Sequence, residues 1–338
     1  MRPQQKLILL SLVIGVLLMV AKFVAWFITR SNVILSDAAE SIVNVLASAF
    51  AYYSVYLSAL PRDENHPYGH GKVEFFSAFI EGALIGIAGL SIALKSTYNL
   101  FYPEPVNDLL TGTFIVIAAG AVNGLLGVFL QKRGRELHSI TIEADGKHLI
   151  SDAVTSVAMI AGLLLIWFTK IAWLDSAISV AMGVYLLIVG YRLVRRSVGG
   201  LMDEADAGIV EEFISVLNKN RQDPWIDLHN LRAQQYGPDL HIDCHMTLPN
   251  YFDLKEVHRE VSTVDALGNG HFKRNIEFFI HADPCLPECC HYCRMKNCPI
   301  RSEEQRMDIT WTLANATENK KHFEQELARR GAVPNTQI

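Results

Sequence analysis

Two apolar segments of this 338-residue chain carry matched rows of polar side chains. Within each row the residues are spaced three and then four apart, so they share one face of a helix. The first row is Asp37, Glu40 and Asn44, and the second is Asp145, His148 and Asp152. Asp37 and Asp145 lie outside the inner four residues. Their role could be hydrogen bonding, ion entry or an outer layer of ligands. Two such rows facing each other would enclose a cage of ligands.

The inner four side chains have the chemistry of a divalent-cation site. The carboxylates of Glu40 and Asp152 can balance the charge of a divalent cation in a low-dielectric interior. Neutral His148 supplies a nitrogen, and Asn44 supplies an amide oxygen. This mixture suits zinc, iron, cobalt or manganese in tetrahedral geometry. Hydrogen bonding between helices is the alternative role for these residues.

A segment between two apolar stretches carries a smaller group of the same kind. His66 and His70 lie four residues apart, and Asp63 precedes them. Two histidines with a nearby carboxylate can bind metal, but surface histidines near a turn have the same pattern. Spacing alone leaves both interpretations open.

Four residues in the second half of the chain are expected on neighbouring strands. His281 and Asp283 alternate onto one face of a strand, and strand pairing could bring His229 and His245 together. Each of them alone fits an ordinary polar surface. As a set they indicate a second metal site.

All six cysteines follow the apolar region, and five of them are clustered. The cluster contains a C-x2-C pair and His291, in a compartment that keeps thiols reduced. A structural zinc cluster, a metal-sensing or donor site, an iron–sulfur or redox site and inert cysteines are the alternatives. The clustered residues are Cys285, Cys289, Cys290, Cys293 and Cys298.

The elements that position these residues begin with long apolar stretches. Six stretches are long enough to span a hydrocarbon core of ~30 Å, which needs roughly 20 residues each. Lysine and arginine gather in the loops on one side, so we expect a multi-pass protein of the cell (inner) membrane with both termini in the cytosol. The six stretches are about 7–29, 33–59, 75–100, 109–131, 142–168 and 173–195.

The rest of the chain has the pattern of a soluble protein. Its apolar periodicity predicts the order αββαβ, a small two-layer α+β domain. The pattern is a helix over 206–220, strands over 225–237 and 240–248 joined by a turn at Gly-Pro-Asp, a helix behind the N-cap Asp253 and a strand over 275–283.

These patterns predict three regions. They are a six-helix transmembrane domain (1–201), a cytosolic metal-binding α+β domain (202–284), and a Cys-rich segment with a polar tail that is helical or loosely ordered (285–338).

Several runs of residues resemble the motifs of one known family. SNVILSDAAESIVNVLAS is similar to that family's second helix, and EADGKHLISD is similar to its fifth. DENHPYGHGKVE resembles its cytosolic signature between helices two and three, and LMDEAD resembles its hinge after helix six. The tail-domain run from HNLRAQQYGP to FIHADP resembles the family as well. Over about residues 7–284 the chain thus resembles the cation diffusion facilitator family of metal–proton antiporters.

The resemblance implies three metal sites and a dimer. The intramembrane site falls on Glu40, Asn44, His148 and Asp152, and a loop site falls on Asp63, His66 and His70. A binuclear site of the tail domain falls on His229, His245, His258, His281 and Asp283. Members of the family are homodimers with tail domains of ferredoxin-like fold, and Lys72 and Asp203 match a charge interlock of that dimer.

Asn44 is the one departure from the family pattern in the intramembrane site. The family usually has two carboxylates, or a histidine and a carboxylate, at the positions of Glu40 and Asn44. An amide oxygen is a harder ligand than the usual one and makes the site more suitable for iron or manganese. Zinc is still the first expectation, and iron and manganese are the alternatives.

The residues and the resemblance together predict a transporter rather than an enzyme. It would export divalent metal in exchange for protons by alternating access. The alternative is a membrane-anchored metal sensor whose cysteine tail signals. No nucleophile–base pair indicates an enzyme, and no basic tract with interleaved aromatic residues indicates nucleic acid.

Overall fold

The computed structural model describes residues 2–29, 32–102, 109–169, 173–272 and 274–329. Side chains are described over the same ranges except at 25, 28–29, 32–37, 39–40, 109–116, 158–169 and 174–175. The chain divides into two compact units, Met1–Met202 and Asp203–Ile338.

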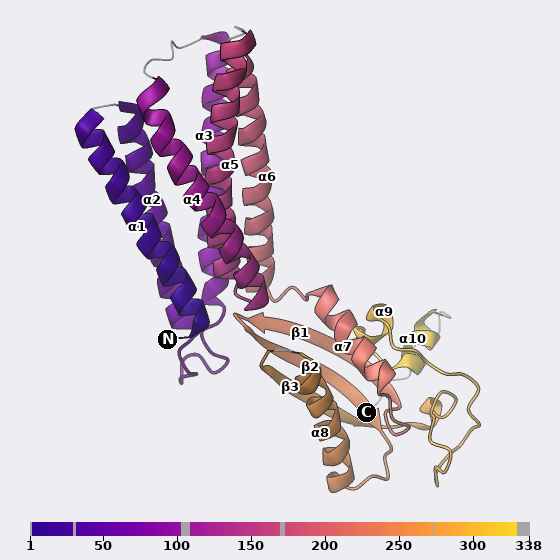
Figure 1. Cartoon of the computed structure of the whole chain (residues 1–338). Helices are drawn as coiled ribbons and strands as arrows, with labels where there is room; N and C mark the ends of the chain where they lie inside the picture. Colours follow the sequence, from indigo (N-terminus) through magenta and orange to yellow (C-terminus); the bar gives the residue numbers. More distant parts are fainter. Residues whose placement is uncertain (1, 30–31, 103–108, 170–172, 273, 330–338) are drawn as a thin grey trace. The chain divides into compact units, whose positions relative to one another are not determined.

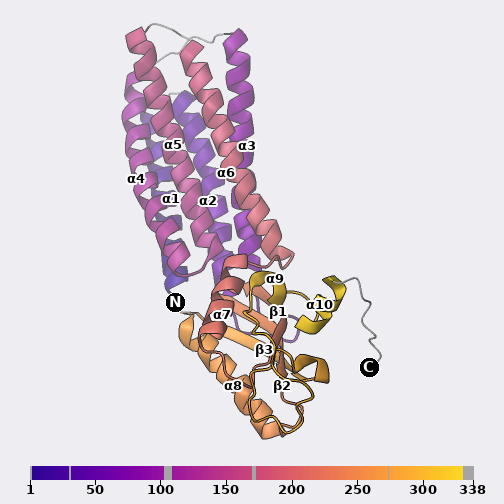
Figure 2. The same ribbon diagram turned by 90° about the vertical axis from the view of Figure 1, so that its right-hand side faces the viewer.

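The described part of the first unit consists of six long helices that run alongside one another (Figure 1, Figure 2). Each has between 27 and 30 residues. Their bounds are α1 Pro3–Thr29, α2 Asn32–Ser58, α3 Val73–Phe101, α4 Leu109–Glu136, α5 Ile140–Thr169 and α6 Trp173–Leu201. Each predicted apolar stretch therefore lies almost entirely within one helix.

Four of these helices are long and apolar enough, within the described residues, to cross a membrane. The qualifying spans are Pro3–Val24, Ser41–Ser58, Val73–Phe101 and Ser176–Leu201. In α4 and α5, part of the apolar stretch falls among the residues whose side chains are not described. Crossing by all six helices stays a prediction.

The helices of the first unit pack closely in pairs. α1 packs on α2, α3 on α6 and α4 on α5. Glycines allow the α3–α6 contact, because a Cβ on Gly190 would lie 2.7 Å from the carbonyl oxygen of Gly82 and from the nitrogen of Gly86. The α4–α5 contact is similar, since a Cβ on Gly146 would lie 2.5 Å from the nitrogen of Gln131. Such backbone approach is typical of helices associating in a membrane.

The second unit begins with the predicted αββαβ order. Its elements are α7 Ala207–Lys219, β1 Asp227–Tyr236, β2 Asp239–Leu248, α8 Leu254–His271 and β3 Ile276–Pro284. The strands form one sheet in the order β1-β2-β3, with β1 antiparallel and β3 parallel to β2. α7 packs on α8 and β1, and α8 packs on β3, so the two helices form a layer on the sheet (Figure 1).

Local sequence signals fix several of these boundaries. Asp253 caps α8 through a reciprocal capping box with Glu256. Asp206 caps α7 by accepting a hydrogen bond from the Gly208 N–H. The predicted Gly-Pro turn joins β1 to β2, and Gly237 adopts the positive φ of 61° that glycine tolerates best.

The segment after β3 packs against the same core as the sheet. It contains a short 3₁₀ helix, Pro287–Cys289, and two helices, α9 Leu313–Ala316 and α10 His322–Arg329. Tyr292, Ile309 and Trp311 are buried in one cluster with residues of α7, β1 and β2. The polar tail, as far as residue 329, therefore has a defined structural role in completing this core.

Candidate metal centres

Asn44 of α2 and His148 of α5 both lie near the carboxylate of Asp152. The side-chain amide of Asn44 donates a hydrogen bond to Oδ2 of Asp152 at 3.0 Å. Nε2 of His148 lies 3.8 Å from the same oxygen. His148 and Asp152 are one helical turn apart on α5, so both reach the side that faces α2. Three of the four predicted inner ligands, Asn44, His148 and Asp152, therefore lie together.

A cavity of about 200 Å³ lies beside these three side chains. Aliphatic residues of α3 and α6 complete its wall. The side chains of Asp37 and Glu40 lie outside the described residues, so their part in this site stays a prediction. The polar residues that line the cavity are Asn44, His148, Ser151, Asp152 and Thr155.

Glu81 is a buried carboxylate beside His148 that the two rows do not predict. It lies on α3, its side chain is 1% exposed, and its Oε2 is 3.6 Å from Nδ1 of His148. A carboxylate next to the second ring nitrogen fixes the tautomer and orientation of a histidine ligand. The available signal was an acidic residue inside an apolar stretch, but Glu81 does not belong to either repeat.

Asp145 connects three helices through hydrogen bonds. The hydroxyl of Ser11 on α1 donates to Oδ2 of Asp145 at 2.5 Å, and the hydroxyl of Ser48 on α2 donates to Oδ1 at 3.1 Å. Asp145 is fully buried. Because both of its carboxylate oxygens accept hydrogen bonds, this arrangement favours a structural role over a place among the ligands.

The side chains of Asp63, His66 and His70 lie close together in the loop between α2 and α3. Oδ1 of Asp63 lies 3.0 Å from Nδ1 of His66, and Oδ2 lies 3.3 Å from Nε2 of His70. One ligand atom from each residue lies within 4.8 Å of the others. The geometry thus allows a cation to be held on the loop.

Three histidines lie side by side across the sheet of the second unit. His229 on β1 pairs with His245 on β2, which pairs with His281 on β3. The carboxylate of Asp283 lies 3.2 Å from His229, 3.4 Å from His245 and 3.3 Å from His281. One ligand atom each from His229, His245 and Asp283 lies within 4.8 Å of the others. The cross-strand pairing predicted from the sequence supplies this arrangement.

The protonation of this group suits cation binding at neutral pH. Burial alone would raise the pKa of Asp283, but the hydrogen bond from His229 and the positive charge of Lys321 lower it to about 2. Burial lowers the pKa of His245, despite the nearby Asp283 charge. A carboxylate that stays ionised and a neutral imidazole are the forms that bind metal.

A second layer of buried residues lies behind His229. Asp227 lies 3.9 Å from Nδ1 of His229 and accepts a hydrogen bond from the Tyr292 hydroxyl at 3.1 Å. The ring and the backbone N–H of His322 on α10 also bond to Asp227, at 2.5 and 2.8 Å. Sequence spacing could not predict these partners, because they come from the Cys-rich segment and the tail.

For the remaining predicted residues, the structure shows a position but no complete site. His258 is exposed on α8 and does not belong to the His229, His245 and Asp283 group. Lys72 and Asp203 belong to different compact units, so their interlock stays a prediction.

All five clustered cysteines line one small cavity of the second unit.

The two units also match known protein domains. Residues 8–202 match the cation efflux transmembrane domain, and residues 209–285 match the cytoplasmic domain of cation efflux proteins. An uncharacterized transporter of Synechocystis sp. is 34% identical over 237 residues, which cover 70% of this chain and 76% of that protein.

Two cation-efflux pumps named FieF cover more of the chain. The pump of Cronobacter sakazakii is 28% identical over 82% of this chain and 91% of its own length. The pump of Escherichia fergusonii is 29% identical over 80% of this chain and 89% of its own length. The domain matches and these relatives agree with a bundle of apolar helices followed by a small cytoplasmic domain. The chain belongs to the cation diffusion facilitator, or cation efflux, family of integral membrane transporters.

Proposed function

We propose that this protein exports divalent transition-metal cations from the cytosol in exchange for protons. The observation that carries the proposal is the convergence of Asn44 and His148 on the Asp152 carboxylate, beside a cavity of about 200 Å³. Polar and ionisable side chains inside a membrane-spanning bundle are costly, and they mark ion pathways. The transport site is formed by Glu40, Asn44, His148 and Asp152.

Metal binding would rearrange the hydrogen bond between Asn44 and Asp152. The amide of Asn44 presents its N–H group to Asp152. Rotation of the amide would present the oxygen to the cation instead, while Asp152 becomes a ligand. With an amide oxygen in the site, zinc is the first candidate, and iron and manganese are the alternatives.

Proton exchange follows from competition for the same atoms. Metal binds neutral His148 and ionised Asp152, and protons bind those same groups. Where the outside is more acidic than the cytosol, protonation would release the metal outward. The reset to the inward-facing state would then carry protons inward, by alternating access around a fixed site.

The rest of the proposal concerns the assembly in the membrane. All six helices cross the cell membrane, both termini are cytosolic, and the protein is a homodimer. The match of residues 209–285 to a cytoplasmic domain supports this orientation. The His229, His245 and Asp283 group would bind cytosolic metal and tighten the dimer when metal is abundant, and the loop group at Asp63 would hold a weaker ion.

Reconstituted vesicles test the proposal directly. Vesicles that are acidic inside should accumulate external zinc, and a proton ionophore that collapses the pH gradient should stop the accumulation. Running the assay with zinc, iron, manganese, cobalt and cadmium ranks the metals. Metal uptake that ignores the pH gradient would refute proton exchange, and no uptake of any of these metals would refute transport and favour the membrane-anchored sensor.

A further inference from the structure

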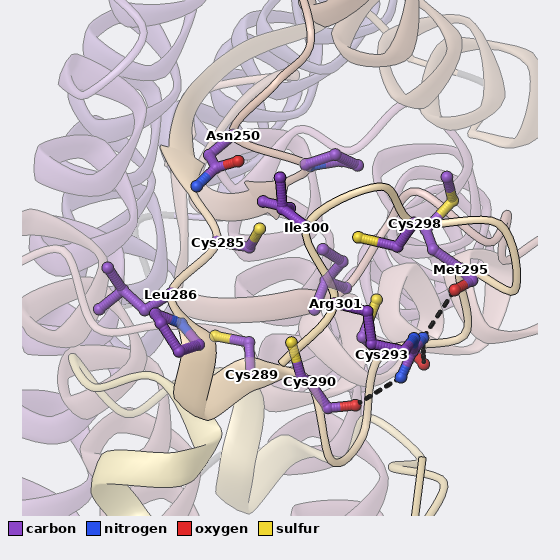
Figure 3. Close-up of a pocket in the computed structure, with 13 residues that line it drawn as sticks. Asn250, Cys285, Leu286, Cys289, Cys290, Cys293, Met295, Cys298, Ile300 and Arg301 are labelled. Carbon is purple, nitrogen blue, oxygen red and sulfur yellow. Dashed lines mark hydrogen bonds between the residues drawn. The ribbon is translucent and has the colours of Figure 1, made fainter. Parts of the chain in front are cut away.

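Five cysteines that follow β3 surround one small cavity (Figure 3). The cavity measures about 50 Å³, which is room for only a few water molecules. All six cysteines of the chain are free thiols. The five residues around the cavity are Cys285, Cys289, Cys290, Cys293 and Cys298.

Cys289 differs from the other four in the direction of its sulfur atom. Cys289 and Cys293 are both buried in the core with Tyr292 and Trp311. In Figure 3 the sulfur atom of Cys289 points away from the space that the other four sulfur atoms surround.

The other four thiols surround one space. Cys285, Cys290, Cys293 and Cys298 all line the cavity, and Figure 3 shows their sulfur atoms around it. Four cysteine sulfur atoms are the complete ligand set of a structural tetrahedral zinc site.

The backbone presents these four residues from fixed positions. They are separated by four, two and four residues. The Cys285 N–H is bonded to the Leu248 carbonyl at the end of the sheet, at 2.9 Å. A turn bonds the Cys293 N–H to the Cys290 carbonyl at 3.3 Å. A C-x2-C turn of this kind can direct two sulfur atoms to a single ion.

Arg301 holds the loop closed and supplies positive charge. Arg301 is one of the residues that line the same cavity. It donates hydrogen bonds to the carbonyl oxygens of Cys290, Cys293 and Met295, at 3.1, 3.0 and 2.6 Å. Four thiolates around a divalent cation have an excess of negative charge, which an adjacent guanidinium partly offsets.

We propose that Cys285, Cys290, Cys293 and Cys298 bind one zinc ion as a tetrahedral four-thiolate site, and that Cys289 is not a ligand. Each thiol gives up its proton on binding, so zinc would displace up to four protons. The described thiols do not form a group with three ligand atoms within 4.8 Å of one another. Binding would therefore draw the loop inward, to the Zn–S distance of about 2.3 Å.

An iron–sulfur cluster is the competing assignment. The C-x4-C-x2-C spacing of the first three ligands also occurs in plant-type [2Fe–2S] proteins. Metal content and acid-labile sulfide of the purified protein separate the two assignments.

Zinc at this site would stabilise the neighbouring metal group of the sheet. Tyr292 lies between the second and third ligands, and its hydroxyl donates to Asp227, which lies beside His229. Fixing the loop would thus fix Asp227. The site depends on the second unit alone and does not require the proposed transport mechanism.

Zinc content of the purified full-length protein tests the assignment. After treatment with a chelator that strips histidine and carboxylate sites, the wild-type protein should keep about one zinc per chain. Cys285→Ser, Cys290→Ser, Cys293→Ser and Cys298→Ser should each reduce this retained zinc at least about tenfold. Cys289→Ser and Cys244→Ser are matched controls at buried cysteines, and both should keep the zinc.

Two measurements on the wild-type protein avoid any failure of a variant to fold. Cobalt exchanged into the site should show thiolate-to-cobalt charge-transfer bands and the d–d bands of tetrahedral coordination. Alkylation followed by mass spectrometry should find the four ligands protected with zinc and modified after stronger chelation. Iron with acid-labile sulfide would overturn the zinc assignment, and equal zinc retention by all six variants would overturn the site.

Discussion

At the scale of single residues, Glu81 is a buried carboxylate near the proposed ligand His148. Its Oε2 is 3.6 Å from Nδ1 of His148, which is longer than a hydrogen bond. We propose that the two groups approach when metal binds Nε2, so that Glu81 then orients the ring.

Glu81→Gln should therefore weaken metal affinity without removing a ligand. Loss of such an orienting partner typically lowers metal affinity about 10- to 100-fold. We expect the metal concentration for half-maximal transport to rise by about tenfold, with a smaller change in the maximal rate. Metal-dependent flux in vesicles measures both quantities. An unchanged half-maximal concentration would show that Glu81 does not orient His148.

Asn44 is the residue expected to set metal preference. Asn44→Asp replaces a neutral oxygen ligand with a carboxylate of nearly the same shape. The change should favour zinc over manganese by about tenfold or more, because zinc gains more from the added anionic ligand. Competition between the two metals in the same vesicles measures this ratio. A ratio equal to that of the wild type would mean that Asn44 is not a ligand.

At the scale of elements, the sequence predicted which segments form and the pairing of β1 with β2, but not how the long helices pack in pairs. Apolar length indicated the six long helices, and alternation with capping signals indicated the αββαβ order. The α3–α6 and α4–α5 pairs depend on backbone contact at glycines. Glycine spacing such as that of Gly82 and Gly86 indicates close helix packing but does not say which helix is the partner. Helices in the tail were one of the two alternatives that the sequence left open, but the packing of Tyr292 and Trp311 into the core depends on contacts distant in sequence and was not predicted.

Gly190→Ala tests the contact between α3 and α6. The added Cβ would lie 2.7 Å from backbone atoms of Gly82 and Gly86, and such overpacking costs about 1–3 kcal/mol. The melting temperature of the purified protein should fall. Gly86→Ala is the matched control, because its Cβ would meet no heavy atom within 4 Å. Equal melting temperatures for the two variants would contradict the packing described here.

His322→Ala tests the docking of α10 on the sheet. The change removes the 2.5 Å hydrogen bond between the His322 ring and buried Asp227, at a cost of about 1–3 kcal/mol. We expect faster proteolysis in the segment after Arg301 and easier unfolding of the second unit in urea. His271→Ala removes an exposed ion pair with Glu212 and should cost less than about 1 kcal/mol. If both variants behave alike, the bond to Asp227 does not hold α10.

At the scale of the whole molecule, the rows of polar residues could be recognised from the sequence because a helix converts regular spacing into a common face. Asn44, His148 and Asp152 are brought together on this basis. The supporting residues come from other elements, Glu81 from α3 and Ser11 from α1, and no spacing rule connects them to the rows. The tail also completes the core of the second unit, so deleting residues 285–338 would expose that core.

The central claim is that metal crosses the bundle by binding at Asp152. Asp152→Ala should abolish zinc accumulation driven by a pH gradient in vesicles, with the purified variant still folded by its melting temperature. Ser151→Ala is the matched control, since Ser151 lines the same cavity and its hydroxyl bonds only to the Lys147 carbonyl of its own helix in the described structure. It should transport at close to the wild-type rate. Full transport by Asp152→Ala would contradict the account.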